Sequence, residues 1–220
     1  MPYYHDIYKL LVDSPVATFL DLGCCVGQEL RFLATQPGIS ANQLYGADLE
    51  PFFFDLGFRL FRDRDTGNFQ PGKNLLTGNL LDSEEAYTGS ELVRTLHGGI
   101  DAIFASSLFH LWNYETQFFV ATRLVRDICR DRVGSVICGR QVGNPTAGMY
   151  FPPKGIEHLI PQGQYFHNVE STESFWHDVG KATGMRFAVD AGFIEGSSHQ
   201  IRDTAPETAS FLWWKATREE

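Results

Sequence analysis

Hydrophobic and polar positions alternate along the chain in two kinds of segment. Short apolar runs, typical of buried strands, are separated by longer stretches whose apolar residues recur at helical spacing. This alternation predicts an α/β fold in which a mostly parallel sheet is covered by helices on both faces. We expect a single domain that spans residues 1–220.

The predicted strands occupy residues 17–20, 44–49, 75–80, 100–106, 133–139, 186–189 and 211–216. The last two are joined by a polar loop without a helix, so one of them should run antiparallel to the rest. Residues 142–168 show no clear periodicity and contain four prolines, which predicts a long loop acting as a lid or a substrate wall. Ser171 is the predicted N-cap of the helix that follows this loop.

The first strand leads into a turn of small residues and then into a helical pattern. Gly23 and Gly27 bracket this turn, where only small residues let the backbone approach a bulky ligand. The helix beginning near Gln28 would aim unpaired N–H groups at that ligand, and Asp21 could accept hydrogen bonds from an ammonium or hydroxyl group. The ligand indicated is a nucleoside that carries an amino acid, S-adenosylmethionine in the first instance.

Ligands bind beyond the carboxyl ends of strands in open α/β sheets, so the residues after each predicted strand are the candidates. Asp48 lies where a carboxylate can accept from both ribose hydroxyls, although it could instead cap a helix before Pro51. Asn79 could bind the adenine amino group, or could simply belong to a Gly-Asn turn. The candidate cofactor-binding residues are Asp21, Gly23, Cys24, Cys25, Gly27, Asp48, Leu49, Asn79, Leu80 and Ser106.

Two histidines are candidates for proton transfer at the acceptor. His110 follows the fourth predicted strand and His167 ends the long loop, and a neutral imidazole can act as a base toward a hydroxyl. Each could also have a purely structural role, orienting a loop or a helix end. Three further polar residues are candidates for substrate binding: Arg140 and Gln141, predicted just past the fifth strand, and Asn168.

The composition of the chain excludes several classes of function. The 18 Lys and Arg against 27 Asp and Glu give a net charge of -9, the wrong sign for holding a phosphate backbone, so nucleic acid is not the expected substrate. No apolar stretch is long enough for a membrane span and no secretory signal is visible, so we expect a cytoplasmic protein. The four cysteines lack metal-ligand spacing, so we expect reduced thiols and no metal.

Five segments carry a resemblance to a known family: Leu-Asp-Leu-Gly-Cys-Cys-Val-Gly-Gln-Glu-Leu-Arg (20–31), Leu-Tyr-Gly-Ala-Asp-Leu (44–49), Phe-Asp-Leu-Gly-Phe-Arg-Leu-Phe-Arg-Asp-Arg (54–64), Gly-Arg-Gln-Val-Gly (139–143) and His-Asn-Val-Glu-Ser (167–171). Over nearly its whole length the chain resembles the fungal secondary-metabolite methyltransferases of meroterpenoid and related pathways. The resemblance implies a Rossmann-like class I fold with a seven-stranded sheet and an antiparallel last strand. It also implies methyl transfer from S-adenosylmethionine to a carboxylate or hydroxyl oxygen of a small hydrophobic polyketide or terpenoid.

The chain departs from this family in two places. The resemblance implies several tens of residues before the first strand, whereas about sixteen precede it here. A homodimer or a partner chain would then be expected to cover the site. An Arg is also implied immediately before His167, where Phe166 stands.

Three alternatives remain open from the sequence. A nicotinamide oxidoreductase would also suit Asp48, but the turn reads GxxxG and not GxGxxG. A catalytically silent subunit would keep the fold and dock onto another chain. A nucleic-acid or protein methyltransferase is the third, although Asn144-Pro145 follows the fifth predicted strand and not the fourth, where amino-methylating enzymes place such a pair.

Overall fold

The computed structural model describes residues 1–152, 160–197 and 206–219. Its strands are hydrogen-bonded in the order β3-β2-β1-β4-β5-β9-β8. The predicted seven-stranded, mostly parallel α/β sheet is therefore confirmed. The chain divides into two compact units, residues 1–104 with 123–135 and residues 105–122 with 136–220.

The first unit contains four parallel strands, in which β1 pairs with both β2 and β4, and β2 pairs with β3. All four residues of β1 are buried, as expected for a strand with neighbours on both sides. The elements of this unit are α1 (Pro2–Asp13), β1 (Phe19–Leu22), α2 (Gln28–Ala34), β2 (Leu44–Asp48), α3 (Phe52–Phe61), β3 (Leu75–Thr77), α4 (Glu84–Thr88), α5 (Glu91–Leu96), β4 (Ala102–Phe104) and a π-helical turn (Leu124–Ile128).

The helices of the first unit bury one face each. Helix α1 buries Tyr3, Ile7 and Leu11, which follow one another at intervals of four residues and so lie on one face of the helix. Helix α2 starts at Gly27, whose left-handed φ of 70° allows the sharp turn into the helix. Helix α3 ends at Arg62, which also adopts a left-handed conformation.

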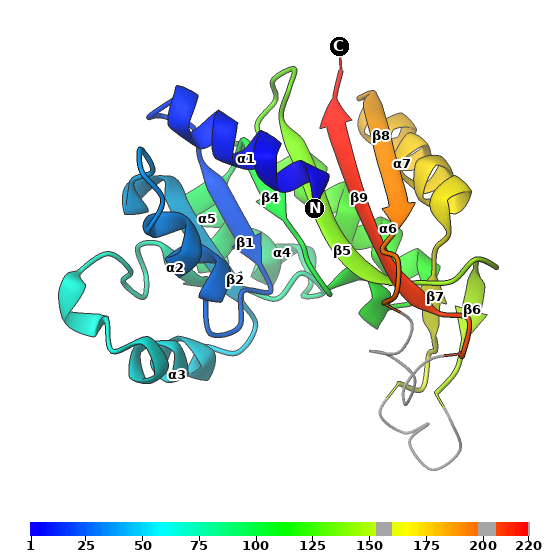
Figure 1. The fold of residues 1–220 in the computed structure, drawn as a ribbon, viewed down its shortest axis with the longest axis horizontal. Coiled ribbons are helices and arrows are strands. Elements are labelled where there is room, and N and C mark those ends of the chain that lie inside the picture. Colours follow the sequence, from blue (N-terminus) through cyan, green and yellow to red (C-terminus); the bar gives the residue numbers. More distant parts are fainter. Residues whose placement is uncertain (153–159, 198–205, 220) are drawn as a thin grey trace. The chain divides into compact units, whose positions relative to one another are not determined.

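The second unit is built on an antiparallel ladder, because β9 runs antiparallel to both β5 and β8. The expected antiparallel last strand is therefore confirmed. Helix α7 packs against β8, and the two lie side by side in Figure 1. The elements of this unit are a 3₁₀ turn (Phe109–Leu111), α6 (Tyr114–Arg123), β5 (Val136–Gly143), β6 (Gly148–Tyr150), β7 (Gln164–Phe166), α7 (Val169–Thr183), β8 (Phe187–Phe193) and β9 (Ser210–Arg218).

Three sequence predictions in this unit were wrong. Strand β5 runs on to Gly143, so Arg140 and Gln141 lie within the strand and not past its end. The segment 142–168 is not a single loop, because β6 and β7 pair antiparallel inside it; residues 153–159 lie outside the described part. Helix α7 is capped by Asn168 and not by Ser171, although Ser171 completes the capping box.

No helix in the described ranges is long and apolar enough to cross a membrane.

Candidate functional site

The turn after β1 is held by backbone hydrogen bonds to the end of β2. The N–H groups of Gly23 and Cys24 both donate to the carbonyl of Ala47, at 2.8 and 3.0 Å, and the N–H of Gly27 donates to the carbonyl of Cys24 at 2.7 Å. Gly23 and Gly27 have φ of 76° and 70°, where a side chain would be strained. Cys25 accepts such a conformation at φ 49°, which marks the turn as a constrained element.

The carboxylate of Asp48 is fixed against this turn. Its Oδ2 accepts from the N–H of Cys25 at 2.8 Å and its Oδ1 from the N–H of Glu50 at 3.1 Å. Each oxygen keeps a lone pair for a ligand hydroxyl. Helix α3 is capped by Pro51, so the alternative of Asp48 as its N-cap is wrong.

Asp21 carries an unused acceptor at the end of β1. Its side chain is buried, with 4% exposed, and Oδ2 has no hydrogen-bond partner among the described residues. Burial, followed by the negative charges of Glu29 and Asp48, raises the pKa of this carboxyl well above its usual range. A cationic group brought to this position would both satisfy the oxygen and offset the charge of the neighbouring carboxylates.

These observations test whether the residues fit the predicted cofactor. The left-handed glycine turn lets a ligand approach the backbone closely. Asp48 keeps lone pairs that can accept from the ribose hydroxyls of S-adenosylmethionine, and the unused oxygen of the buried Asp21 can accept from its ammonium group. The polar groups of the first unit therefore fit this cofactor.

Three other candidates of the first unit lie after β2 and β3. Asn79 closes a turn, because its Nδ2 donates to Asp82 Oδ1 at 2.7 Å and its Oδ1 accepts from the N–H of Leu81 at 3.0 Å. This geometry favours the turn interpretation over adenine binding. Leu80 is buried, whereas Leu49 leaves 64% of its surface exposed beside Asp48.

The cysteines of the turn are thiols in different surroundings. Cys24 is buried and Cys25 is half-buried, and burial raises the pKa of the Cys24 thiol. Among the residues that the structure describes, no group of three or more His, Cys, Asp and Glu side chains could hold a metal ion.

In the second unit, the positive charge of Arg140 acts on the imidazole of His110. Burial, and after it the positive charge of Arg140, lowers the pKa of His110 to about 4. The Arg140 guanidinium stacks 4.3 Å from the ring centre of Phe211. Within the described ranges, His110 Nδ1 and Arg140 Nε have no hydrogen-bond partner, so both can still bind an anionic or hydroxyl group. Ser106 is half-buried between two residues that bond to β5.

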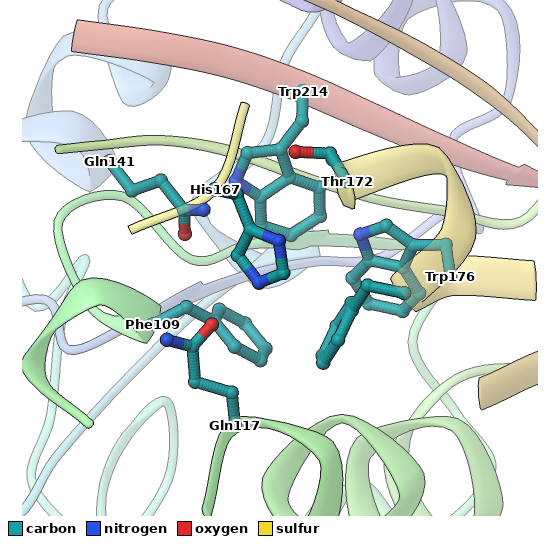
Figure 2. A pocket seen from close by; sticks show the side chains of 8 residues that line it. Phe109, Gln117, Gln141, His167, Thr172, Trp176 and Trp214 are labelled. Atoms are coloured by element: carbon teal, nitrogen blue, oxygen red, sulfur yellow. The ribbon is translucent and has the colours of Figure 1, made fainter. Parts of the chain in front are cut away.

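His167 lies in a different environment, where its ring contacts those of Tyr165 and Phe175. It lines a small cavity together with Phe109, Trp176 and Trp214 (Figure 2). Its Nδ1 lies 3.0 Å from Ser171 Oγ, and burial lowers its pKa to about 4. The cavity beside it has a volume of about 10 Å³, roughly the space of one water molecule. Gln141 also lines this cavity and is buried, with 3% exposed.

Gln117 fixes the polar side of this cavity. Its Nε2 donates to the carbonyls of Trp112 and Tyr165, both at 2.9 Å, which leaves Oε1 without a partner in the described part of the chain. His167 Nε2 and Trp214 Nε1 have none there either. The structure thus brings His167 and Gln141 together around a space too small for a substrate.

Asn168 is used elsewhere. Its Oδ1 accepts from the N–H of Ser171 at 2.8 Å and its Nδ2 donates to the carbonyl of Pro145 at 3.2 Å. Its side chain therefore caps α7 and ties the preceding segment to it.

Sequence reasoning missed Tyr4 and Glu29. The Tyr4 hydroxyl donates to Glu29 Oε2, and the charge of Glu29 acts on Asp21. Only the position of Glu29, in the first turn of the helix after the glycine turn, could have pointed to it.

Comparisons with known proteins show which proteins the chain is similar to. No protein-family model matches the chain. It is 37% identical over 198 residues to O-methyltransferase phiE from Fungal sp. (strain ATCC 74256), covering 90% of this chain and 60% of that protein. It is 33% identical over 198 residues to O-methyltransferase atr3 from Stereocaulon alpinum, covering 89% of this chain and 52% of that protein. The chain therefore spans a little over half the length of these relatives.

A solved structure shows the same fold. The N-terminal domain of EvdMO1, solved with SAH and D-fucose, superposes with a TM-score of 0.61 over 99% of this chain and 82% of its own, at 11% identity. Together these similarities confirm the predicted resemblance: the chain is a homologue of fungal proteins named O-methyltransferases, and its fold is that of the class I S-adenosylmethionine-dependent methyltransferases.

Proposed function

We propose that the chain transfers a methyl group from S-adenosylmethionine to an oxygen of a small hydrophobic secondary metabolite. The observation that carries this proposal is the turn after β1, where the N–H of Cys25 holds Asp48 and the buried Oδ2 of Asp21 stays available. Similarity to proteins named O-methyltransferases supports oxygen as the acceptor atom.

Asp48 would bind the ribose, because its two oxygens are already oriented by backbone N–H groups and need not reorganise. Asp21 would accept a hydrogen bond from the cofactor's ammonium group. Leu49 would offer apolar surface to the adenine, as would Leu80, the residue after Asn79. Cys24, Cys25, Gly23 and Gly27 would line the amino-acid end through the turn backbone, and Ser106 would follow the fourth strand.

The bound cofactor supplies an electrophilic sulfonium methyl group, so the chain needs neither a nucleophile nor a metal. Its residues must hold the acceptor oxygen in line and exclude water. At neutral pH the imidazole of His110 is uncharged and can accept a proton, but its lowered pKa makes it a weak base. Because a carboxylate arrives without a proton, this environment supports a carboxylate better than a hydroxyl.

Arg140 would hold the acceptor's negative charge, since its guanidinium is stacked on Phe211 and keeps a free Nε donor in the described structure. Gln141, Asn168 and His167 are less well placed for this task, because the first and last line a water-sized cavity and Asn168 caps α7. We propose no nucleic-acid partner. A cytoplasmic location, and a homodimer or partner chain that covers the site, stay predictions.

Calorimetric titration with S-adenosylhomocysteine, followed by mass spectrometry of a panel of aromatic and terpenoid acids and alcohols, tests this function. We expect binding in the micromolar range and a gain of one methyl group on an acid. Uptake of NADH without affinity for S-adenosylhomocysteine would instead indicate the oxidoreductase alternative. Binding without turnover of any acceptor would support the catalytically silent subunit.

A further inference from the structure

Tyr4, Glu29 and Asp21 come from three different elements of the first unit and meet beside the end of β1. Asp21 pairs in register with Phe104 of β4. The ring of Tyr4, from α1, packs edge-on against Phe104 with ring centres 5.8 Å apart. Burial, the hydrogen bond to Glu29 and, after them, the negative charge of Asp21 raise the pKa of the Tyr4 hydroxyl, so Tyr4 lies close to Asp21. That hydroxyl donates to Glu29 in the first turn of α2.

This cluster is rich in acceptors and poor in donors. The Tyr4 hydroxyl uses its one proton on Glu29 and keeps an acceptor lone pair. Asp21 is 4% exposed and offers the unpartnered Oδ2 noted above, and an unsatisfied buried oxygen costs about 1 to 3 kcal/mol. Once Asp21 gives up its proton, two carboxylates beside a hydroxyl acceptor complement a primary ammonium, which carries three N–H donors and no acceptor.

We infer that Glu29 and Tyr4 act with Asp21 as a recognition site for the α-ammonium group of the cofactor's amino-acid moiety. This inference rests on the proposed function and adds two residues to it. Asp21 accepts one N–H, Glu29 supplies the second negative charge, and Tyr4 orients Glu29 by its hydroxyl. Because Tyr4 stands on α1, binding of the ammonium group also fixes that helix over the turn.

A purely structural role for the pair is the competing explanation. In that case the Tyr4–Glu29 hydrogen bond only ties α1 to α2, and its loss lowers stability without regard to the chemistry of the ligand. The two explanations differ for a ligand that lacks the ammonium group. 5′-Methylthioadenosine keeps the adenosine and the sulfur of S-adenosylhomocysteine but has no amino-acid moiety.

The experiment measures the dissociation constants of both ligands by calorimetry for the parent chain, Glu29→Gln and Tyr4→Phe. We expect Glu29→Gln to weaken S-adenosylhomocysteine about tenfold or more and Tyr4→Phe about threefold, with little change for 5′-methylthioadenosine. Glu85→Gln and Tyr8→Phe, exposed or half-buried positions on α4 and α1, are the matched controls and should change neither constant. Tyr4→Phe keeps the ring against Phe104, so it should fold even where Glu29→Gln does not.

A second measurement counts protons. Burial and the neighbouring carboxylates keep the pKa of Asp21 high, and a cation placed against it lowers that pKa, so binding should release a proton. Calorimetry in two buffers of different ionisation enthalpy should show this release with S-adenosylhomocysteine and not with 5′-methylthioadenosine.

The outcomes separate the two proposals. Failure of the parent chain to bind either ligand overturns the proposed function itself. Binding of both ligands, with Glu29→Gln and Tyr4→Phe affecting them equally or not at all, leaves the function standing and overturns the ammonium site.

Discussion

The backbone N–H of Cys25 donates to Oδ2 of Asp48 at 2.8 Å, which joins the turn after β1 to the end of β2. A single carboxylate thus serves the protein and, in the proposed function, the ribose. Its position does not depend on the ligand, because a second N–H, that of Glu50, fixes the other oxygen. This arrangement makes Asp48 the residue whose loss should affect cofactor binding most directly.

Replacing Asp48 with Ala should weaken S-adenosylhomocysteine binding about 10- to 100-fold. The change removes hydrogen bonds to a charged acceptor, each worth about 1.5 to 3 kcal/mol, and frees the N–H of Cys25. Calorimetric titration measures the loss. Asp65→Asn, an exposed carboxylate of the same unit, is the control. An unchanged dissociation constant for Asp48→Ala would show that the ribose binds elsewhere.

Gly57→Ala should destabilise the protein by about 1 to 3 kcal/mol. A Cβ at Gly57 would lie 2.5 Å from the carbonyl oxygen of Val26, so α3 must move away from the turn. Denaturant unfolding measures this loss. Gly148→Ala is the matched control, because a Cβ there meets nothing within 4 Å among the described atoms. Equal stability of the two variants would mean that α3 does not press on the turn.

The buried histidines should make stability depend on pH. His167 has a folded pKa of about 4, below its usual value of 6.5, so the unfolded chain binds more protons between these values. Stability should therefore fall as pH decreases from about 6.5 to 4 and stay level above that window. A shift of this size corresponds to a contribution on the order of 3 kcal/mol at the acid end.

His167→Gln should reduce that decline but not abolish it, because the pKa of His110 is also about 4 and His110 contributes a similar loss. Chemical denaturation at pH 7, 6, 5 and 4.5 can measure the difference. His177→Gln, an exposed position on α7, the helix that follows His167, controls for the loss of an imidazole in general. If the His167 variant loses stability toward acid pH as steeply as the parent, His167 does not titrate in the folded state as described here.

The sheet and the turn could be predicted because their signals are local. Buried strands such as β1 appear as short apolar runs, and Gly23 and Gly27 are needed where φ is positive. Strand β5 was predicted too short because Arg140 and Gln141 are polar. The sequence pattern does not reveal that Arg140 stacks on Phe211, or that Gln141 is buried beside His167.

The side-chain partners of the site could not be predicted, because they depend on contacts between distant segments. Tyr4 and Glu29 are 25 residues apart, and no local pattern pairs them. Asn168 looked like a substrate ligand by its place at the end of a loop, whereas the helix it caps begins at the next residue. The pairing of β6 with β7 was hidden because each strand has only three residues, too few to show an alternating pattern.

Gln117→Met should cost about 2 to 3 kcal/mol of stability. Its amide supplies hydrogen bonds to two carbonyls, those of Trp112 and Tyr165, and Met fills a similar volume without any donor. Thermal or denaturant unfolding gives the difference, with Gln36→Met, at a half-buried position just past the end of α2, as the control. A loss no larger than that of the control would show that these carbonyls find other donors.

Cys25 should be the cysteine that reacts first with iodoacetamide in the native protein, because Cys24, Cys129 and Cys138 are buried and Cys25 is half-buried. Since Cys25 lies in the turn proposed to face the cofactor, saturating S-adenosylhomocysteine should slow its alkylation several-fold. Peptide mass spectrometry over a time course gives the rates at each thiol, and Cys25→Ser identifies the signal. Equal rates with and without the ligand, at concentrations where calorimetry shows saturation, would place the bound cofactor away from this turn.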